Sequence, residues 1–210
     1  MPTNSYPAVR LDRKRAAMVF VDHQAGLLLG VQDHDKEELR RNVIALALIA
    51  KAFEVPVIMT TSAADGPNGP VISELAAVVP DALIVHRPGE IDAMDNPDFA
   101  AALRDSGRDQ LIISGISTDV CVSFVAQSAI AAGYGAWAVT DASGTWSTLS
   151  ADAACDRMAR AGVILTSTVA VAAELLVDWR TKGGDQIASI FGQYAIPAYS
   201  SLLAFAKNGG

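Results

Sequence analysis

Six short apolar runs, separated by helix-forming and turn-forming segments, constrain the fold of this chain more than any other feature. Runs that are apolar throughout are typical of strands buried on both faces, and strands alternating with helices form a parallel sheet. We therefore predict an α/β fold, a three-layer doubly wound sheet of six mainly parallel strands in the order 3-2-1-4-5-6. The six runs are Ala16–Val21, Val55–Thr60, Leu83–Val85, Leu111–Ser114, Ala136–Thr140 and Val163–Thr166.

Local signals predict where the helices lie between these strands. Asp35 and Glu38 form a capping pair at the start of a helix whose apolar residues recur on one face. Gly26 and Gly30 punctuate the segment after the first strand, which we predict to be a loop. We predict a later helix over Val169–Arg180.

Length and composition indicate one domain that hides apolar surface. A chain of 210 residues suits a single large α/β domain, which we assign to residues 1–182. Residues 183–210 are predicted to be a C-terminal tail that packs on the domain or on a neighbouring subunit. With 51% hydrophobic and only 19% charged residues, the chain is predicted to be a homo-oligomer.

Charge and the lack of known motifs argue against several functional classes. A net charge of −7 leaves no basic stripe for nucleic acid. The basic residues near the N-terminus are not followed by an apolar signal segment, and the longest uncharged run, Ala161–Ala173, is too short to span a bilayer. We therefore predict a cytoplasmic protein without a membrane partner. No dinucleotide or phosphate loop is evident, and the three histidines lack metal-site spacing, so no cofactor and no metal are predicted.

The predicted strand order places three reactive side chains at one edge of the sheet. In this order strands 1 and 4 are neighbours, and ligands bind beyond their carboxyl ends. Asp22 ends the first strand, Cys121 lies just after the fourth, and Arg87 follows the third. We therefore expect Asp22 and Cys121 to face one crevice with Arg87 nearby.

Cys121 is the predicted nucleophile of this crevice. It lies where a helix is expected to begin, and the unpaired amides and the helix dipole there favour thiolate over thiol. Cys155 lies in the middle of a predicted helix and is read as an inert core residue. Asp22 can accept the thiol proton and return it to a leaving group, and Arg87 can orient the carboxylate.

A purely structural role is an alternative interpretation for these residues. Cys121 can be a small buried hydrophobe, and Asp22 can cap a turn. A Cys–His pair with His23 or His86 is a further alternative, although each histidine is the sequence neighbour of a crevice residue and should point to the opposite face. Asp65 is read as a turn residue.

Four segments of the chain resemble the isochorismatase-like cysteine hydrolases, and within them the YcaC-like branch. The segments are VFVDHQAGL (Val19–Leu27), HRPGEIDAMDNPDF (His86–Phe99), GISTDVCV (Gly115–Val122) and TDASGTW (Thr140–Trp146). The resemblance covers nearly the whole chain and implies the isochorismatase-like hydrolase fold. It implies that Asp22, Arg87 and Cys121 are catalytic, with Arg87 in the place where most of the family has lysine; an arginine can orient a partner but does not readily release a proton.

The resemblance also implies details of the site and of the assembly. It implies a cis peptide bond between Ile116 and Ser117, which would turn the Ser117 N–H toward the crevice, where it forms an oxyanion hole with the Cys121 N–H. The stretch TTSAADGPNG contains no histidine, which argues against the metal site of nicotinamidase-type members. YcaC-like proteins are octamers by the same resemblance, so an octamer is the expected form.

We therefore predict that the protein is a hydrolase that acts on the C–N bond of a small amide through a covalent thioester-type intermediate on Cys121. Two alternatives are an isochorismate-like vinyl ether hydrolase and a non-catalytic oligomeric protein that binds small molecules on the same scaffold. Gln24, Leu28 and Trp146 are the predicted walls of the substrate pocket.

Overall fold

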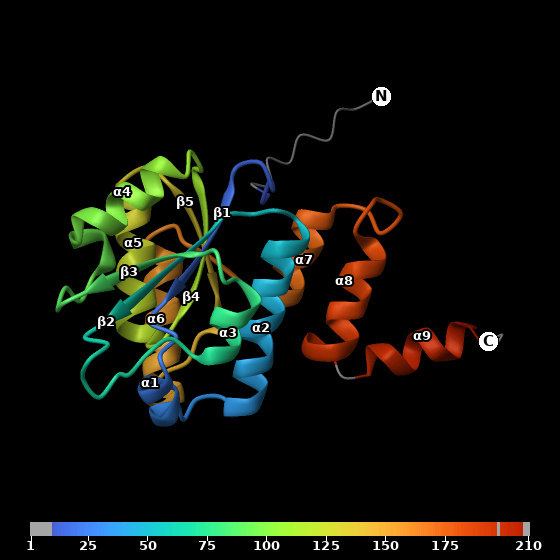
Figure 1. Cartoon of the computed structure of the whole chain (residues 1–210), viewed down its shortest axis with the longest axis horizontal. Helices are drawn as coiled ribbons and strands as arrows, with labels where there is room; N and C mark the ends of the chain where they lie inside the picture. Colours follow the sequence, from blue (N-terminus) through green and yellow to red (C-terminus); the bar gives the residue numbers. More distant parts are fainter. Residues whose placement is uncertain (1–9, 197, 208–210) are drawn as a thin grey trace.

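The computed structural model describes residues 10–196 and 198–207, and its centre is one six-stranded parallel sheet (Figure 1). The strand order is β3-β2-β1-β4-β5-β6, which confirms the predicted doubly wound fold. The bounds are β1 (Ala16–Val21), β2 (Val57–Ser62), β3 (Leu83–Arg87), β4 (Gln110–Gly115), β5 (Gly135–Val139) and β6 (Ile164–Thr166).

Helices cover both faces of the sheet, which explains why the strands are apolar throughout. In β1, Met18 and Phe20 pack in the core cluster that includes α2 and α7, whereas Val19 and Val21 pack in the cluster that includes α4, α5 and α6. The helices are α1 (Ala25–Gly30), α2 (Lys36–Ala52), α3 (Ser73–Val78), α4 (Pro97–Asp105), α5 (Ser123–Ala131), α6 (Thr148–Arg160), α7 (Thr168–Leu176), α8 (Gly184–Ile190) and α9 (Tyr199–Lys207), with short turns η1 (Ala93–Asp95), η2 (Thr118–Val122), η3 (Thr140–Ala142) and η4 (Phe191–Ala195).

Local chemistry explains the start of α2 and the end of α7. The Asp35 side chain accepts a hydrogen bond from the Glu38 N–H at 2.9 Å, which confirms the predicted capping pair. The predicted end of the helix at Arg180 is wrong, because Val177 adopts a left-handed backbone (φ 67°) that stops α7 at Leu176.

The predicted loop after β1 is also wrong, because that segment forms the short helix α1. Gly26 is required there for close approach rather than for a turn. Its N–H donates to the Asn68 carbonyl at 2.9 Å, and a side-chain carbon at position 26 would lie 2.0 Å from the Pro67 carbonyl oxygen. This contact holds the loop between β2 and α3 over the end of β1.

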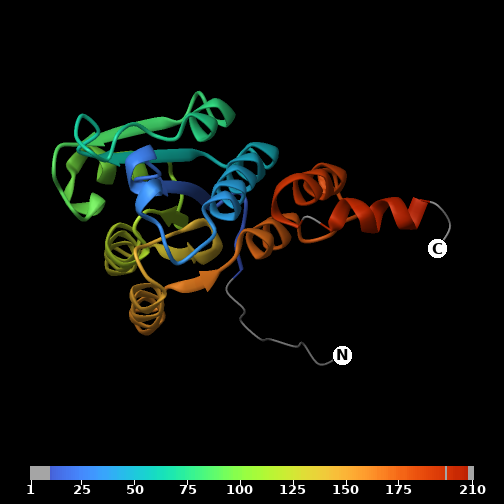
Figure 2. The same cartoon turned by 90° about the horizontal axis from the view of Figure 1, so that it is seen from below.

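The segment after residue 182 is helical and lies to one side of the sheet (Figures 1 and 2). Ile187, Ile190 and Phe191 are buried in the same cluster as α2, whereas α9 exposes Leu202 and Phe205. The assignment of this segment as a tail separate from the domain stays a prediction. Within the described residues, no helix is long and apolar enough to cross a membrane.

Burial of α2 against the sheet leads to a stability prediction. Leu46 is fully buried in the core cluster, so Leu46→Ala should lower the free energy of unfolding by about 2–5 kcal/mol through lost transfer energy and a residual cavity. Lys51→Ala, at an exposed position of the same helix, is the control and should change stability by less than about 1 kcal/mol. Urea unfolding measures both, and equal effects would contradict the assigned burial.

Candidate active site

The predicted crevice residues meet where the carboxyl ends of β1 and β4 lie side by side. Val21 and Gly115 are register partners at these ends. Asp22, with a left-handed backbone (φ 56°), follows β1 directly, and Cys121 lies on the η2 turn after β4. Both line a cavity of about 250 Å³, together with Ser117 and Trp146.

Arg87 lies at the end of β3 and pairs with the Asp22 carboxylate. Both side chains are fully buried, and the Arg87 Nη2 donates to Asp22 Oδ2. The Nε donates to Thr60 Oγ1 at 2.8 Å, and Nη1 donates to the Glu90 carbonyl oxygen. All three guanidinium nitrogens therefore have partners, which fixes the orientation of the carboxylate.

The second carboxylate oxygen is placed to receive a proton. Asp22 Oδ1 is buried and has no hydrogen-bond partner of its own among the described residues. The Cys121 thiol interacts with this carboxylate. A buried acceptor without a partner is unfavourable, so an oxygen in this place beside a thiol is suited to act as a general base.

The Cys121 thiol is protonated at rest, contrary to the predicted thiolate. Burial raises the pKa of Cys121 to about 12, and the charge of Asp22 adds to the increase. The Ser117 N–H and the Arg87 charge oppose this shift without reversing it. Burial also raises the pKa of Asp22, against the lowering effect of Arg87. The helix dipole does not lower the pKa of Cys121 enough to give a thiolate. Cys121 lies on the wide π-type turn η2, before the start of α5, and its burial removes it from water.

The η2 turn presents backbone amides beside the sulfur. The peptide bond between Ile116 and Ser117 is cis, as the resemblance implies. The Ser117 backbone amide interacts with the Cys121 sulfur and lowers the pKa of the thiol, and the Ser117 carbonyl accepts a hydrogen bond from the Val122 N–H at 3.0 Å. The Thr118 N–H donates to the Gly144 carbonyl at 3.0 Å and anchors the turn. The Ser117 amide therefore lies next to the candidate nucleophile.

The structure does not support a Cys–His pair. His23 is buried beside Ser114, with 3.2 Å between Nε2 and Oγ, and burial lowers its pKa to about 3. His86 is exposed, and its Nδ1 lies 2.8 Å from Thr61 Oγ1. Each histidine thus has a partner away from Cys121, as the strand alternation indicates.

The cavity walls differ from the prediction. Trp146 lines the cavity, but Leu27 replaces the predicted Leu28, which packs against the core cluster. The predicted wall residue Gln24 is fully buried, and its side chain instead donates to the carbonyls of Ser62 and Gly69 and accepts from the Ser62 N–H. Gln24 therefore shapes the loop that closes the cavity rather than the wall itself.

Sequence reasoning missed four further wall residues, Ser62, Asn68, Ile91 and Val120. Ser62 ends β2 and each of the others comes from a different loop or turn, so no local spacing signals their places. The predicted turn residue Asp65 lies exposed in the loop after β2. Among the described residues, no group of three histidine, cysteine or acidic side chains could hold a metal ion.

The chain is similar to known proteins in both sequence and structure. The isochorismatase domain family matches residues 16–170. An Escherichia coli (strain K12) protein known as "Probable hydrolase YcaC" is 46% identical over 197 residues, which are 94% of each chain. The crystal structure of E. coli YcaC, described as an octameric hydrolase of unknown specificity, has a TM-score of 0.92 and 47% identity, covering 96% of this chain and 98% of that one. YcaC from Pseudomonas aeruginosa, solved with hexane-2,5-diol and covalent acrylamide, has a TM-score of 0.92 and 46% identity, covering 97% of this chain and 100% of that one.

The electrostatics of the site predict the effect of neutralising Asp22. Asp22→Asn removes the negative charge that raises the pKa of Cys121, so the pKa should fall and iodoacetamide should alkylate Cys121 about tenfold faster at about pH 9, the effect of one pKa unit. Mass spectrometry of each cysteine against pH measures the rates. Cys155 in the same molecule is the control, and its profile should not move; an unchanged or slower Cys121 would contradict the assigned coupling.

The buried ion pair predicts an order of stability among Arg87 variants. Arg87→Met leaves the buried Asp22 charge without its partner and should cost about 3–5 kcal/mol. Arg87→Lys keeps the charge but loses the contacts to Thr60 and Glu90, so its loss should be smaller. Urea unfolding compares the two, and a methionine variant as stable as the lysine variant would rule out this role of the pair.

Proposed function

The chain belongs to the isochorismatase family, and from this premise we propose that it is a hydrolase in which Cys121 attacks the carbonyl carbon of a small amide. The observation that carries the proposal is the Asp22 carboxylate, fully buried, fixed by Arg87, and in contact with a thiol that is protonated at rest. A base and a nucleophile so arranged suit acyl transfer. The name of the E. coli relative supports the coarser assignment, a hydrolase.

The proposed reaction moves one proton between Cys121 and Asp22. As the sulfur attacks the carbonyl carbon, Asp22 accepts the thiol proton, and the N–H groups of Ser117 and Cys121 stabilise the oxyanion. One such donor is worth about 10²–10³ in rate. The protonated Asp22 then donates to the departing amine as the C–N bond breaks, which leaves a thioester on Cys121. Water attacks the thioester, Asp22 takes the proton of the water and returns it to the sulfur, and the acid leaves.

The cavity favours a small substrate without charge. Leu27, Ile91, Ile116, Val120 and Trp146 contribute apolar walls, and no lysine, arginine or histidine of the described chain lines it. The charge of Arg87 is already committed to Asp22. A dianion such as isochorismate would bring two carboxylates beside Asp22 without a cation to pair them, so the vinyl ether alternative is disfavoured.

The P. aeruginosa relative supports a reactive nucleophile in this fold, and it does not identify the substrate. It was solved with covalent acrylamide, an electrophile that nucleophiles attack at the vinyl carbon while its amide stays intact. At 46% identity over the full length of that chain, a similar reactivity toward electrophiles is expected here.

We propose in addition that the chain forms a homo-oligomer. The E. coli relative is octameric, and α9 of this chain exposes Leu202 and Phe205, which are apolar side chains suited to contact with another subunit.

The proposed hydrolysis is tested with a panel of neutral amides, namely formamide, acetamide, propionamide and benzamide. We expect release of ammonia and, on rapid quenching, an acyl adduct on the intact protein by mass spectrometry. Cys121→Ala should abolish both, and Asp22→Asn should slow turnover by about 10²–10⁴ because the general base is lost.

Cys155→Ala is the matched control and should retain full activity. Turnover by the Cys121→Ala variant at the wild-type rate would refute the proposed nucleophile. Absence of turnover and of adduct with every amide, in a folded wild-type protein, would instead favour the non-catalytic binding alternative.

A further inference from the structure

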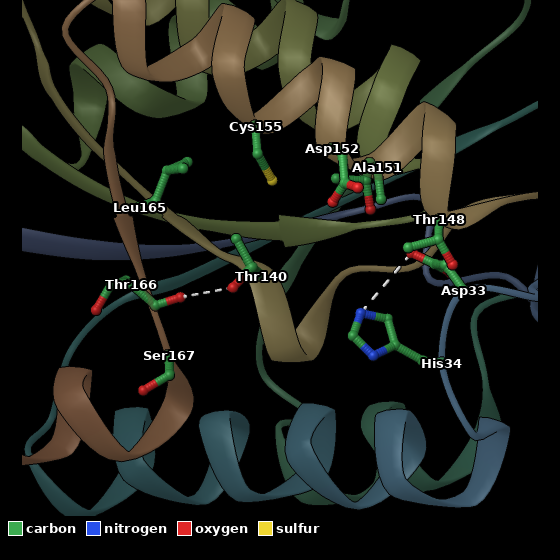
Figure 3. Close-up of a pocket in the computed structure, with 11 residues that line it drawn as sticks. Asp33, His34, Thr140, Thr148, Ala151, Asp152, Cys155, Leu165, Thr166 and Ser167 are labelled. Carbon is green, nitrogen blue, oxygen red and sulfur yellow. Dashed lines mark hydrogen bonds and ion pairs between the residues drawn. The ribbon is translucent and has the colours of Figure 1, made fainter.

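A second cavity, of about 450 Å³, lies beyond the carboxyl ends of β5 and β6 (Figure 3). It shares no lining residue with the Cys121 cavity. Its lining comes from four parts of the chain. Asp33 and His34 lie in the segment before α2, Thr118 lies on η2, and α6 contributes Asp152 and Cys155. Thr140 and the residues around Thr166 complete it, and Thr140 donates to the Thr166 carbonyl at 3.1 Å.

Two buried polar groups in this lining lack partners. The Asp33 side chain is only 2% exposed; its Oδ1 accepts from the Thr145 N–H at 2.7 Å, but its Oδ2 has no hydrogen-bond partner in residues 10–196 and 198–207. His34 Nε2 lies 3.7 Å from Asp33 Oδ2, which is within ion-pair range when the histidine is protonated but too far for a hydrogen bond (Figure 3). Thr118 is 3% exposed, and within the same residues its Oγ1 also has no partner. Buried polar atoms are rarely left unpaired, so these two atoms are suited to bind a polar ligand.

The charge of the lining identifies the kind of ligand. Asp33 and Asp152 are both carboxylates, both act on the nearby Cys155, and no described lysine or arginine lines the cavity to balance them. The acidic and metal-binding side chains do not converge into a metal site anywhere in the described chain. Leu165, Ala151 and the Cys155 side chain add an apolar part. An organic cation with a short aliphatic body matches this combination.

We propose that this cavity binds a small protonated amine, whose ammonium group pairs with Asp33 and whose hydroxyl or other polar end meets Thr118. The amine supplies the donor that Asp33 Oδ2 lacks, and Thr118 supplies a hydroxyl that can both donate and accept. The proposal does not depend on the proposed hydrolysis, because none of its residues belongs to the Asp22–Arg87–Cys121 site.

The site is joined to the Cys121 cavity through two elements. Thr118 and Cys121 lie on the same η2 turn. Asp33 accepts a hydrogen bond from the Thr145 N–H, and the next residue, Trp146, lines the Cys121 cavity. The Thr145 side chain also donates a hydrogen bond to Asp119 on η2, with 2.7 Å between the oxygens. A ligand on Asp33 therefore contacts the framework that shapes the other cavity.

Calorimetry on the full chain tests the proposal with three probes of matched length: 4-aminobutan-1-ol, butane-1,4-diol and 4-hydroxybutanoate. The amine should bind about tenfold or more tightly than the neutral diol, and the anion should bind least, because only the amine offers a charged donor to Asp33. Equal affinity for amine and diol, or no saturable binding of the amine, would overturn the proposal.

Variants assign the binding to this cavity. Asp33→Asn can keep the Oδ1 bond to Thr145 while replacing the Oδ2 acceptor with a donor, so it should weaken amine binding about tenfold or more. Asp152→Asn, at an exposed position of α6, should also weaken amine binding. Asp81→Asn makes the same charge change before β3, at the opposite edge of the sheet, and should bind the amine as the wild type does.

Cys155 provides a direct reporter of occupancy. Bound amine should slow iodoacetamide alkylation of Cys155, which lines this cavity, and leave Cys121, which lines the other, less affected. The proposal would be refuted if the Asp33 and Asp152 variants bound the amine as tightly as the wild type. It would also be refuted if the amine protected only Cys121 from alkylation, because the amine would then bind at another place.

Discussion

The buried pair of Asp22 and Arg87 is the interaction on which the rest of the site depends. A carboxylate and a guanidinium are costly to remove from water, and their burial is tolerated only with close pairing and full hydrogen bonding. Arg87 meets this condition by binding Thr60 on β2 and the Glu90 carbonyl as well as Asp22. The pair therefore joins the ends of β1 and β3 across β2 and sets the position of one carboxylate oxygen.

The same burial decides where the proton lies. A dry site disfavours any new charge, and a thiolate beside a carboxylate would be a second negative charge, so the pKa of Cys121 rises to about 12. On the proposed mechanism this is an advantage, because the proton leaves the sulfur only as the carbonyl carbon is attacked. On the same proposal, the Ser117 amide, which lies beside the sulfur, donates a hydrogen bond to the developing oxyanion.

The η2 turn connects the two cavities of this molecule. Thr118 and Cys121 are separated by three positions on one wide turn and line different cavities. The loop from Gly144 to Trp146 is held on both sides, by Thr118 through the Gly144 carbonyl and by Asp33 through Thr145. The catalytic proposal and the amine-site proposal thus share one rigid framework, although their reacting and binding groups are distinct.

The sequence by itself determined the sheet order and the meeting of Asp22, Arg87 and Cys121, because six apolar runs and the topology rule for parallel sheets leave few arrangements. It also determined the start of α2, because a capping pair is local chemistry. Only the tertiary structure decided that Leu27 and not Leu28 faces the cavity and that Gln24 binds the Ser62 loop, since α1 is held by a distant loop through Gly26. Only the tertiary structure decided the protonation state of the Cys121 thiol as well. A helix start can be read from neighbouring residues, whereas desolvation and the charge of Asp22 come from segments about a hundred residues apart, which only the folded chain brings together.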